Sequence, residues 1–162
     1  AARAHDATIS ALLEQCDKKL GSHAVDTMIR MTLERTRRNA IHLYLGATPK
    51  HDIGACVPLF LRYLRPPIDA AMGVDASGAT PLMIAATNPK CTSGAVRALV
   101  ECGAVALDAT YGDEEGGTVL LRVLRLRKSE KLLRALLAKG ARVDARDARG
   151  APAGSRGLSL FH

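Results

Sequence analysis

Residues 75–86 constrain the fold of this 162-residue chain more than any other segment. The residue types come in the order of a tight turn that leads directly into a capped helix. Gly78 can adopt the positive φ that such a turn requires. Thr80 can accept a hydrogen bond from an unpaired N–H of the following helix, and Pro81 then stands at the first helical position, where its missing N–H is harmless. The segment therefore predicts a turn joined to a short helix.

Related segments follow further along the chain. Residues 117–124 repeat the Thr and Leu positions of residues 80–82 after 38 residues, without the proline. Two further segments, residues 96–104 and residues 133–141, also resemble each other. Near the end of each stands a glycine, Gly103 or Gly140, which we expect to end a helix by adopting the left-handed backbone conformation. The recurrence predicts a chain built from repeated helical units.

The ordered set from Asp75 through Gly78, Thr80, Pro81 and Leu82 to the alanine pair resembles the ankyrin-repeat signature Asp-x-x-Gly-x-Thr-Pro-Leu-His-x-Ala-Ala. The resemblance implies an all-α ankyrin-repeat solenoid of helix-turn-helix units with short hairpin loops. The diverged repeats would span residues 37–150, in units near 37–73, 74–109 and 110–146. The spacings of 41 and 38 residues exceed the family's usual length, so we expect insertions at residues 88–94 and 111–117.

The first unit is the most diverged. His42 stands where the family usually carries its histidine, and residues 53–64 predict an apolar helix that is interrupted by Pro58 and closed by Pro66 and Pro67. Residues 1–36 form either an N-terminal helical cap or an eroded repeat. Their apolar residues recur at helical spacing in two groups: Ile9, Leu12, Leu13, Cys16 and Leu20, then Val25, Met28, Ile29 and Leu33.

Charge divides the chain into two unequal parts. Residues 1–118 carry 12 Lys and Arg against 13 Asp and Glu, whereas residues 119–162 carry 11 against 3. The basic part is either a solvated surface or a docking surface for an acidic partner, which is an RNA backbone or an acidic protein. We assign the basic surface to Arg127, Lys128, Lys131, Arg134, Lys139, Arg142, Arg146 and Arg149.

The ankyrin resemblance also implies a concave binding face, formed by hairpin tips and by the first helix of each unit. Matched residue by residue, the partner-binding positions are Ser77, Ala79, Met83, Thr87, Tyr111, Asp113, Glu114, Arg122 and Arg125. Alternatively, this face is empty and the chain binds through its ends or its back. Residues 151–162 read as an extended tail, which either frays or anchors itself in a neighbour through Leu158, Leu160 and Phe161.

The sequence offers no constellation for catalysis, metal binding or a cofactor. Its four cysteines lack metal-ligand spacing, and we expect reduced thiols in a reducing compartment, with a Cys91–Cys102 disulfide as the alternative. No apolar run approaches the length of a membrane-spanning helix. The chain does not begin with Met, which is compatible with an imported, processed protein, so the cytoplasm and a mitochondrion or other organelle both stay open.

These observations predict a non-catalytic protein–protein interaction scaffold, without a small-molecule substrate, that serves as an accessory or structural subunit of a larger assembly. Two alternatives remain. The basic C-terminal half docks on RNA within a ribonucleoprotein such as an organellar ribosome, or the chain is a free regulatory adaptor or inhibitor.

Overall fold

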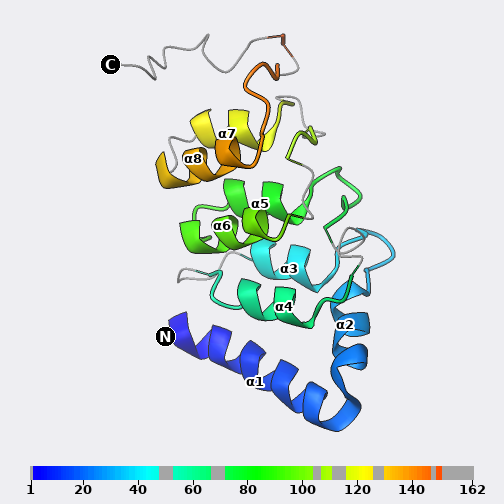
Figure 1. Cartoon of the computed structure of the whole chain (residues 1–162). Helices are drawn as coiled ribbons and strands as arrows, with labels where there is room; N and C mark the ends of the chain where they lie inside the picture. Colours follow the sequence, from blue (N-terminus) through cyan, green and yellow to red (C-terminus); the bar gives the residue numbers. More distant parts are fainter. Residues whose placement is uncertain are drawn as a thin grey trace.

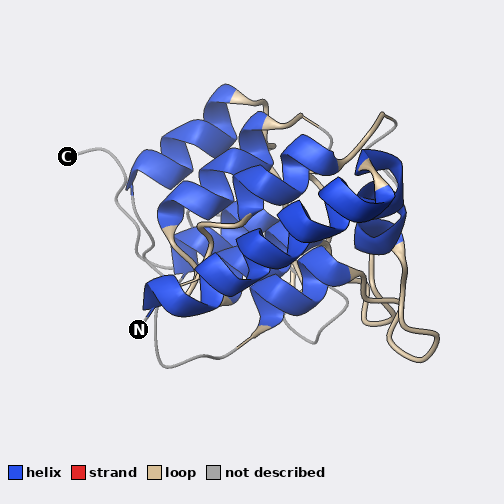
Figure 2. Ribbon diagram, turned by 90° about the horizontal axis from the view of Figure 1, so that it is seen from below, coloured by secondary structure: helices blue, strands red, loops and turns tan. Residues whose placement is uncertain are grey.

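The computed structural model describes residues 2–47, 53–66, 72–103, 107–110, 116–125, 130–146 and 149–150. Over these ranges the regular secondary structure is helical (Figures 1 and 2). The helices are α1 (Ala2–Leu20), α2 (Ser22–Arg30), α3 (Ala40–Gly46), α4 (Val57–Tyr63), α5 (Pro81–Thr87), α6 (Ser93–Glu101), α7 (Val119–Arg125) and α8 (Glu130–Ala138). None of these helices combines the length with the apolar character that crossing a membrane would need.

The helices from α3 onward stack in two rows (Figure 1). Helix α5 lies between α3 and α7 in the odd row, and α6 lies between α4 and α8 in the even row. The rows meet through contacts of α5 with α6 and of α7 with α8. Aliphatic side chains fill the space between them, and Leu82, Leu99, Leu120 and Leu136 are all nearly inaccessible to solvent. The burial of this aliphatic surface supplies the main driving force for stacking.

Local signals read from the sequence reappear in the backbone. Thr80 caps α5 by accepting a hydrogen bond from the N–H of Met83 at 3.2 Å, and Pro81 opens the helix. Gly78 has a φ of 80°, and Gly103 and Gly140 have φ values of 73° and 88° just after α6 and α8. The three glycines therefore occupy the left-handed conformation that the turn and the helix ends require.

The two N-terminal helices cover one end of the stack. Helix α1 packs on α2, and α2 contacts both α3 and α4 (Figure 1). The Tyr44 hydroxyl fixes α1 by donating to Asp6 Oδ1 at 2.7 Å, while it accepts a hydrogen bond from the Gly54 N–H at 2.7 Å. Burial and the hydrogen bond to Asp6 raise the pKa of Tyr44, so its hydroxyl stays protonated and available as this donor.

The apolar faces expected in this region are only partly buried. Leu13, Val25 and Ile29 belong to the core. In contrast, Leu12 and Leu20 are 59% and 65% exposed, and α2 ends at Arg30, so that Leu33 lies beyond it. Helical spacing identified the helices, but it did not show which apolar residues would be covered by a neighbouring element.

The helix expected over residues 53–64 is shorter than predicted. Helix α4 begins at Val57 with Pro58 in its first turn, where proline is tolerated and does not interrupt a helix. Ile53 instead pairs with the loop before α6: its N–H donates to Lys90 O at 2.8 Å, and its carbonyl accepts from the Thr92 N–H at 2.9 Å. The loop that follows α5 is therefore bound to the loop that precedes α4.

All four cysteines lie in the described part of the chain, and each is a free thiol, Cys91 and Cys102 included. Cys56 and Cys91 are buried, whereas Cys16 and Cys102 are partly exposed. Burial raises the pKa of the Cys56 thiol, which keeps it in the poorly nucleophilic protonated form.

Gly54, in the loop before α4, lies close to the start of α6, and substitution at Gly54 tests this packing. Its φ is 131°, and a Cβ atom at this position would lie 2.5 Å from the Ala95 Cβ and 2.7 Å from the Thr92 Oγ1. We expect Gly54→Ala to lower the free energy of unfolding by about 2–4 kcal/mol, from backbone strain and overpacking. Urea denaturation measures it. The control is Gly94→Ala in α6, where a Cβ has room and should change stability by less than about 1 kcal/mol; equal effects of the two substitutions would contradict the packing.

Candidate interaction surface

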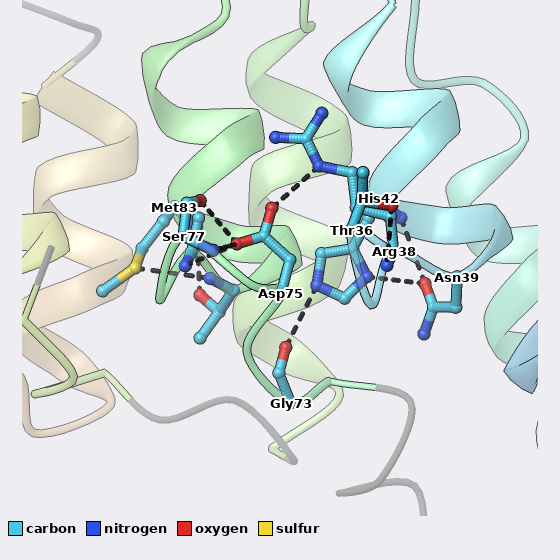
Figure 3. A network of polar contacts seen from close by, with 10 residues as sticks. Thr36, Arg38, Asn39, His42, Gly73, Asp75, Ser77 and Met83 are labelled. Atoms are coloured by element: carbon cyan, nitrogen blue, oxygen red, sulfur yellow. Dashed lines mark hydrogen bonds and ion pairs between the residues drawn. The ribbon is translucent and has the colours of Figure 1, made fainter. Parts of the chain in front are cut away.

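The turn before α5 is organised by the carboxylate of Asp75, which is 3% exposed (Figure 3). Its Oδ1 accepts hydrogen bonds from the Ser77 N–H at 2.8 Å, the Ser77 hydroxyl at 2.5 Å and the Ala79 N–H at 3.0 Å. Its Oδ2 accepts from Arg38 Nε at 2.8 Å. Burial raises the pKa of Asp75, but these hydrogen bonds outweigh burial and lower its pKa to about 2. Asp75 is therefore held ionised as the centre of the turn.

Arg38 belongs to the preceding turn, so the ion pair links two successive units. A backbone hydrogen bond from the Ala76 N–H to Thr36 O at 2.8 Å joins the same two turns. His42 on α3 adds a third link, because its Nε2 lies 3.1 Å from Gly73 O (Figure 3). Its Nδ1 lies 2.7 Å from Asn39 Oδ1, and burial lowers the pKa of His42. Together these contacts fix the turn before α5 against the start of α3.

At the C-terminal end of α5, Asn88 provides a second link between α5 and α3. Its side-chain amide donates to Leu45 O at 2.7 Å and to Ala47 O at 2.8 Å, which are carbonyl groups at the end of α3. Its Oδ1 accepts from the Lys90 N–H at 2.9 Å. The residues after α5, expected from sequence to be an insertion, thus satisfy backbone groups that the preceding helix leaves unpaired.

The three helices of the odd row expose the same two positions. Counting from the residues that directly precede the three helices, which are Asn39, Thr80 and Thr118, these are the fourth and seventh positions, whereas the residues between them are buried. We call this set the exposed stripe: Leu43, Gly46, Ile84, Thr87, Arg122 and Arg125. Helix α5 contacts both α3 and α7, so the stripe residues belong to three helices packed side by side. Gly46 lies close to Ile84, because an added Cβ at Gly46 would lie 3.7 Å from Ile84 Cγ2, an ordinary van der Waals distance.

The exposed stripe contains only part of the expected partner-binding set. Thr87, Arg122 and Arg125 belong to it, and Ser77 and Ala79 are at least partly exposed in the turn before α5. Met83 is fully buried, and its sulfur accepts a hydrogen bond from the Thr80 N–H at 3.4 Å, so its assignment to a binding face is wrong. Tyr111, Asp113 and Glu114 lie outside the described residues.

Sequence reasoning missed three members of the stripe, namely Leu43, Gly46 and Ile84. The signal was present, since Asn39 precedes α3 as Thr80 precedes α5, and aligning the two caps brings Leu43 onto Ile84. Asn39 caps α3 by accepting from the Ile41 and His42 N–H groups, both at 3.1 Å. An asparagine can replace a threonine as a helix cap, so matching threonines alone does not reveal that Asn39 aligns with Thr80.

The basic surface expected from the sequence is partly neutralised by near neighbours. Arg134 pairs with Glu130 at 2.6 Å, Arg142 pairs with Asp144 at 2.8 Å, and Arg146 donates to Gly150 O at 2.8 Å. Lys139 and Arg149 are exposed, and Lys131 lies on α8. Arg127, Lys128 and the expected tail anchor of Leu158, Leu160 and Phe161 fall outside the described residues.

Among the described residues, no cluster of three or more His, Cys, Asp or Glu side chains could hold a metal ion. No protein-family model matches the chain, and no curated protein sequence matches it closely enough to count as a relative.

A positive φ that recurs before the helices of the odd row offers the first test of the turn geometry. Arg37, Gly78 and Gly116 each stand three residues before the first residue of an odd-row helix and have φ values of 53°, 80° and 56°. A non-glycine residue pays a steric penalty there, so we expect Arg37→Gly to raise the free energy of unfolding by about 0.5–1 kcal/mol. Urea denaturation measures the change. Arg35→Gly, in the same exposed turn but without the positive φ, should give no gain; a similar gain would show that strain is not its source.

The carboxylate of Asp75 should make the free energy of unfolding depend on pH in the acid range. Its pKa is about 2 in the folded chain, against about 3.9 for an ordinary Asp, so its contribution is complete above pH 4 and is lost as the pH falls toward 2. We expect the free energy of unfolding to fall by about 2 kcal/mol more in the wild type than in Asp75→Asn over this interval. Urea titrations at pH 5, 4, 3 and 2 measure both; parallel curves would disprove the assignment.

Proposed function

We propose that this chain is a non-catalytic protein-binding scaffold of the ankyrin-repeat type, acting as an accessory subunit of a larger assembly. The observation that carries the proposal is the exposed stripe. Four of the seven residues of α3 and five of the seven residues of α5 and of α7 are buried, while the same two positions of each helix reach the surface. Polar contacts between turns hold α3 and α5 in register. Such a surface is preformed, so a partner would bind it at little cost in ordering the chain.

The resemblance in sequence supports the ankyrin assignment, and so does the backbone. The turn, the capped helix opened by proline and the glycine-terminated second helix of residues 75–103 follow the order of that repeat. Helix α3 also follows a turn and a side-chain cap, which Asn39 supplies, although the proline is absent there. Thr118 stands before α7 as Thr80 stands before α5.

The local pairing of the basic residues favours a protein partner over RNA. Arg134 and Arg142 already neighbour carboxylates, so the described part of the basic surface is a mixed one. The exposed stripe also contains no aromatic side chain on which a base could stack. RNA binding is therefore treated below as an outcome of the test.

The test is recovery of partners from the native source by the tagged full chain, at low salt, with and without ribonuclease. We expect co-purification with a large protein complex that survives ribonuclease. Ile84→Asp, at the centre of the stripe, should reduce recovery at least about tenfold, because it places a charge on an apolar contact. Arg97→Asp on the even-row helix α6 is the control and should leave recovery unchanged.

Three outcomes would overturn parts of this proposal. If Ile84→Asp and Arg97→Asp reduce recovery of the complex equally, and circular dichroism shows both variants to be folded, the stripe is not the binding surface. Loss of the complex on ribonuclease treatment would support the RNA alternative. Recovery as a monomer or as a one-to-one complex would exclude the assembly and leave a free adaptor or inhibitor.

A further inference from the structure

Helix α1 contacts the helical stack near both of its ends. Near its start, Asp6 O accepts a hydrogen bond from the Cys56 thiol at 3.3 Å, and Asp6 Oδ1 accepts from the Tyr44 hydroxyl. Near its end, Asp17 Oδ2 accepts from the Tyr63 hydroxyl at 3.4 Å. Because Cys56 directly precedes α4 and Tyr63 is its last residue, α1 lies along the whole of α4 (Figure 1).

Little apolar surface holds α1 in this position. Of residues 6–20, only Leu13 is fully buried. Ile9 is partly buried against the core, and Leu12 and Leu20 are exposed. Helix α5, by contrast, buries five of its seven residues. A segment with so few buried apolar side chains opens at a lower free energy than the body of the fold.

The connection between α1 and α2 is suited to act as a hinge. Gly21 is the single residue between the two helices, its φ is 83°, and no described atom lies within 4 Å of the place that a Cβ would take. Glycine changes its backbone angles without a steric penalty from a side chain, and hinges consist of a few residues at element ends that absorb such changes. Helix α1 can therefore rotate about Gly21 while Val25 and Ile29 keep α2 in the core.

We propose that α1 is a lid that opens about Gly21 as a unit, while the rest of the fold stays intact. Opening uncovers an aromatic surface. The chain has two Phe and three Tyr residues, and Tyr44, Phe60 and Tyr63 belong to this surface, with the rings of Tyr44 and Phe60 5.4 Å apart. The position of α1 thus controls access to this end of the stack. The inference uses no residue of the exposed stripe, so it is independent of the proposed function.

The Cys56 thiol reports the opening. Cys56 is 1% exposed, and α1 places two groups against its sulfur, Asp6 O at 3.3 Å and Ser10 Oγ at 3.8 Å. A thiol buried in this way reacts only when it reaches solvent. We would treat the folded full chain with N-ethylmaleimide and follow the modification of Cys56 by mass spectrometry of its peptide, which separates it from the other cysteines. The rate of modification follows the fraction of molecules in which the lid is open.

Leu13→Ala removes the buried side chain of α1 and should raise the rate of Cys56 modification at least about tenfold. The matched control is Leu120→Ala on α7, which removes an equally buried leucine distant from α1 and should leave the rate within about twofold. Urea denaturation should show that both variants are destabilised, so the comparison separates local opening from unfolding. Asp6→Ala is the milder variant and should raise the rate about threefold, whereas Glu14→Ala, at an exposed position of the same helix, should not change it.

Three results would overturn the lid. If Leu120→Ala accelerates the modification of Cys56 as much as Leu13→Ala does, Cys56 reaches solvent only when the whole fold opens. If Leu13→Ala is folded by circular dichroism and has no effect, fraying of the first turns of α1 exposes Cys56, and the helix does not move as a unit. If Cys56 stays unmodified in the wild type and in both α1 variants, Leu13→Ala and Asp6→Ala, the helix does not open.

Discussion

When one helix pair stacks on the next, the turns between helices are partly shielded from water. Their backbone N–H and carbonyl groups then need hydrogen-bond partners within the protein. Asp75 meets this need for the turn before α5. Its carboxylate accepts four hydrogen bonds, three from within its own turn and one from Arg38 in the preceding turn. A single buried charge thus shapes a turn and positions it against its neighbour. The orientation of α5, and with it the centre of the exposed stripe, depends on this contact.

The aliphatic core and the polar links play separate roles in the fold. Leu82, Leu99 and Leu120 contribute the free energy of burial, but apolar packing alone tolerates small shifts in the register of neighbouring helices. His42 and Asn88 restrict those shifts, because each reaches backbone groups of the adjoining unit at hydrogen-bond distance. The same positions on α3 and α5 consequently reach the surface together. A binding surface that spans three helices requires this registration.

Part of the fold could be predicted from residue types that act locally. Gly78, Thr80 and Pro81 each favour one backbone conformation for reasons that involve only their near neighbours, and the structure shows all three in the expected roles. The interpretation of Met83 failed because its position on a short helix does not reveal what packs against it. The helix expected from Ile53 onward failed for a related reason, since Ile53 pairs with a loop almost forty residues away.

The sequence by itself determined the helical class of the described chain, the turn and cap before α5, and the glycines that end α6 and α8. These features depend on local sterics and local hydrogen bonds, which a short stretch of residues already contains. The tertiary structure decided which apolar residues are covered, how far α4 extends, and that Leu43, Ile84 and Arg122 lie on one surface. Those outcomes depend on contacts between residues distant in the chain, and burial is a property of the neighbours that surround a side chain.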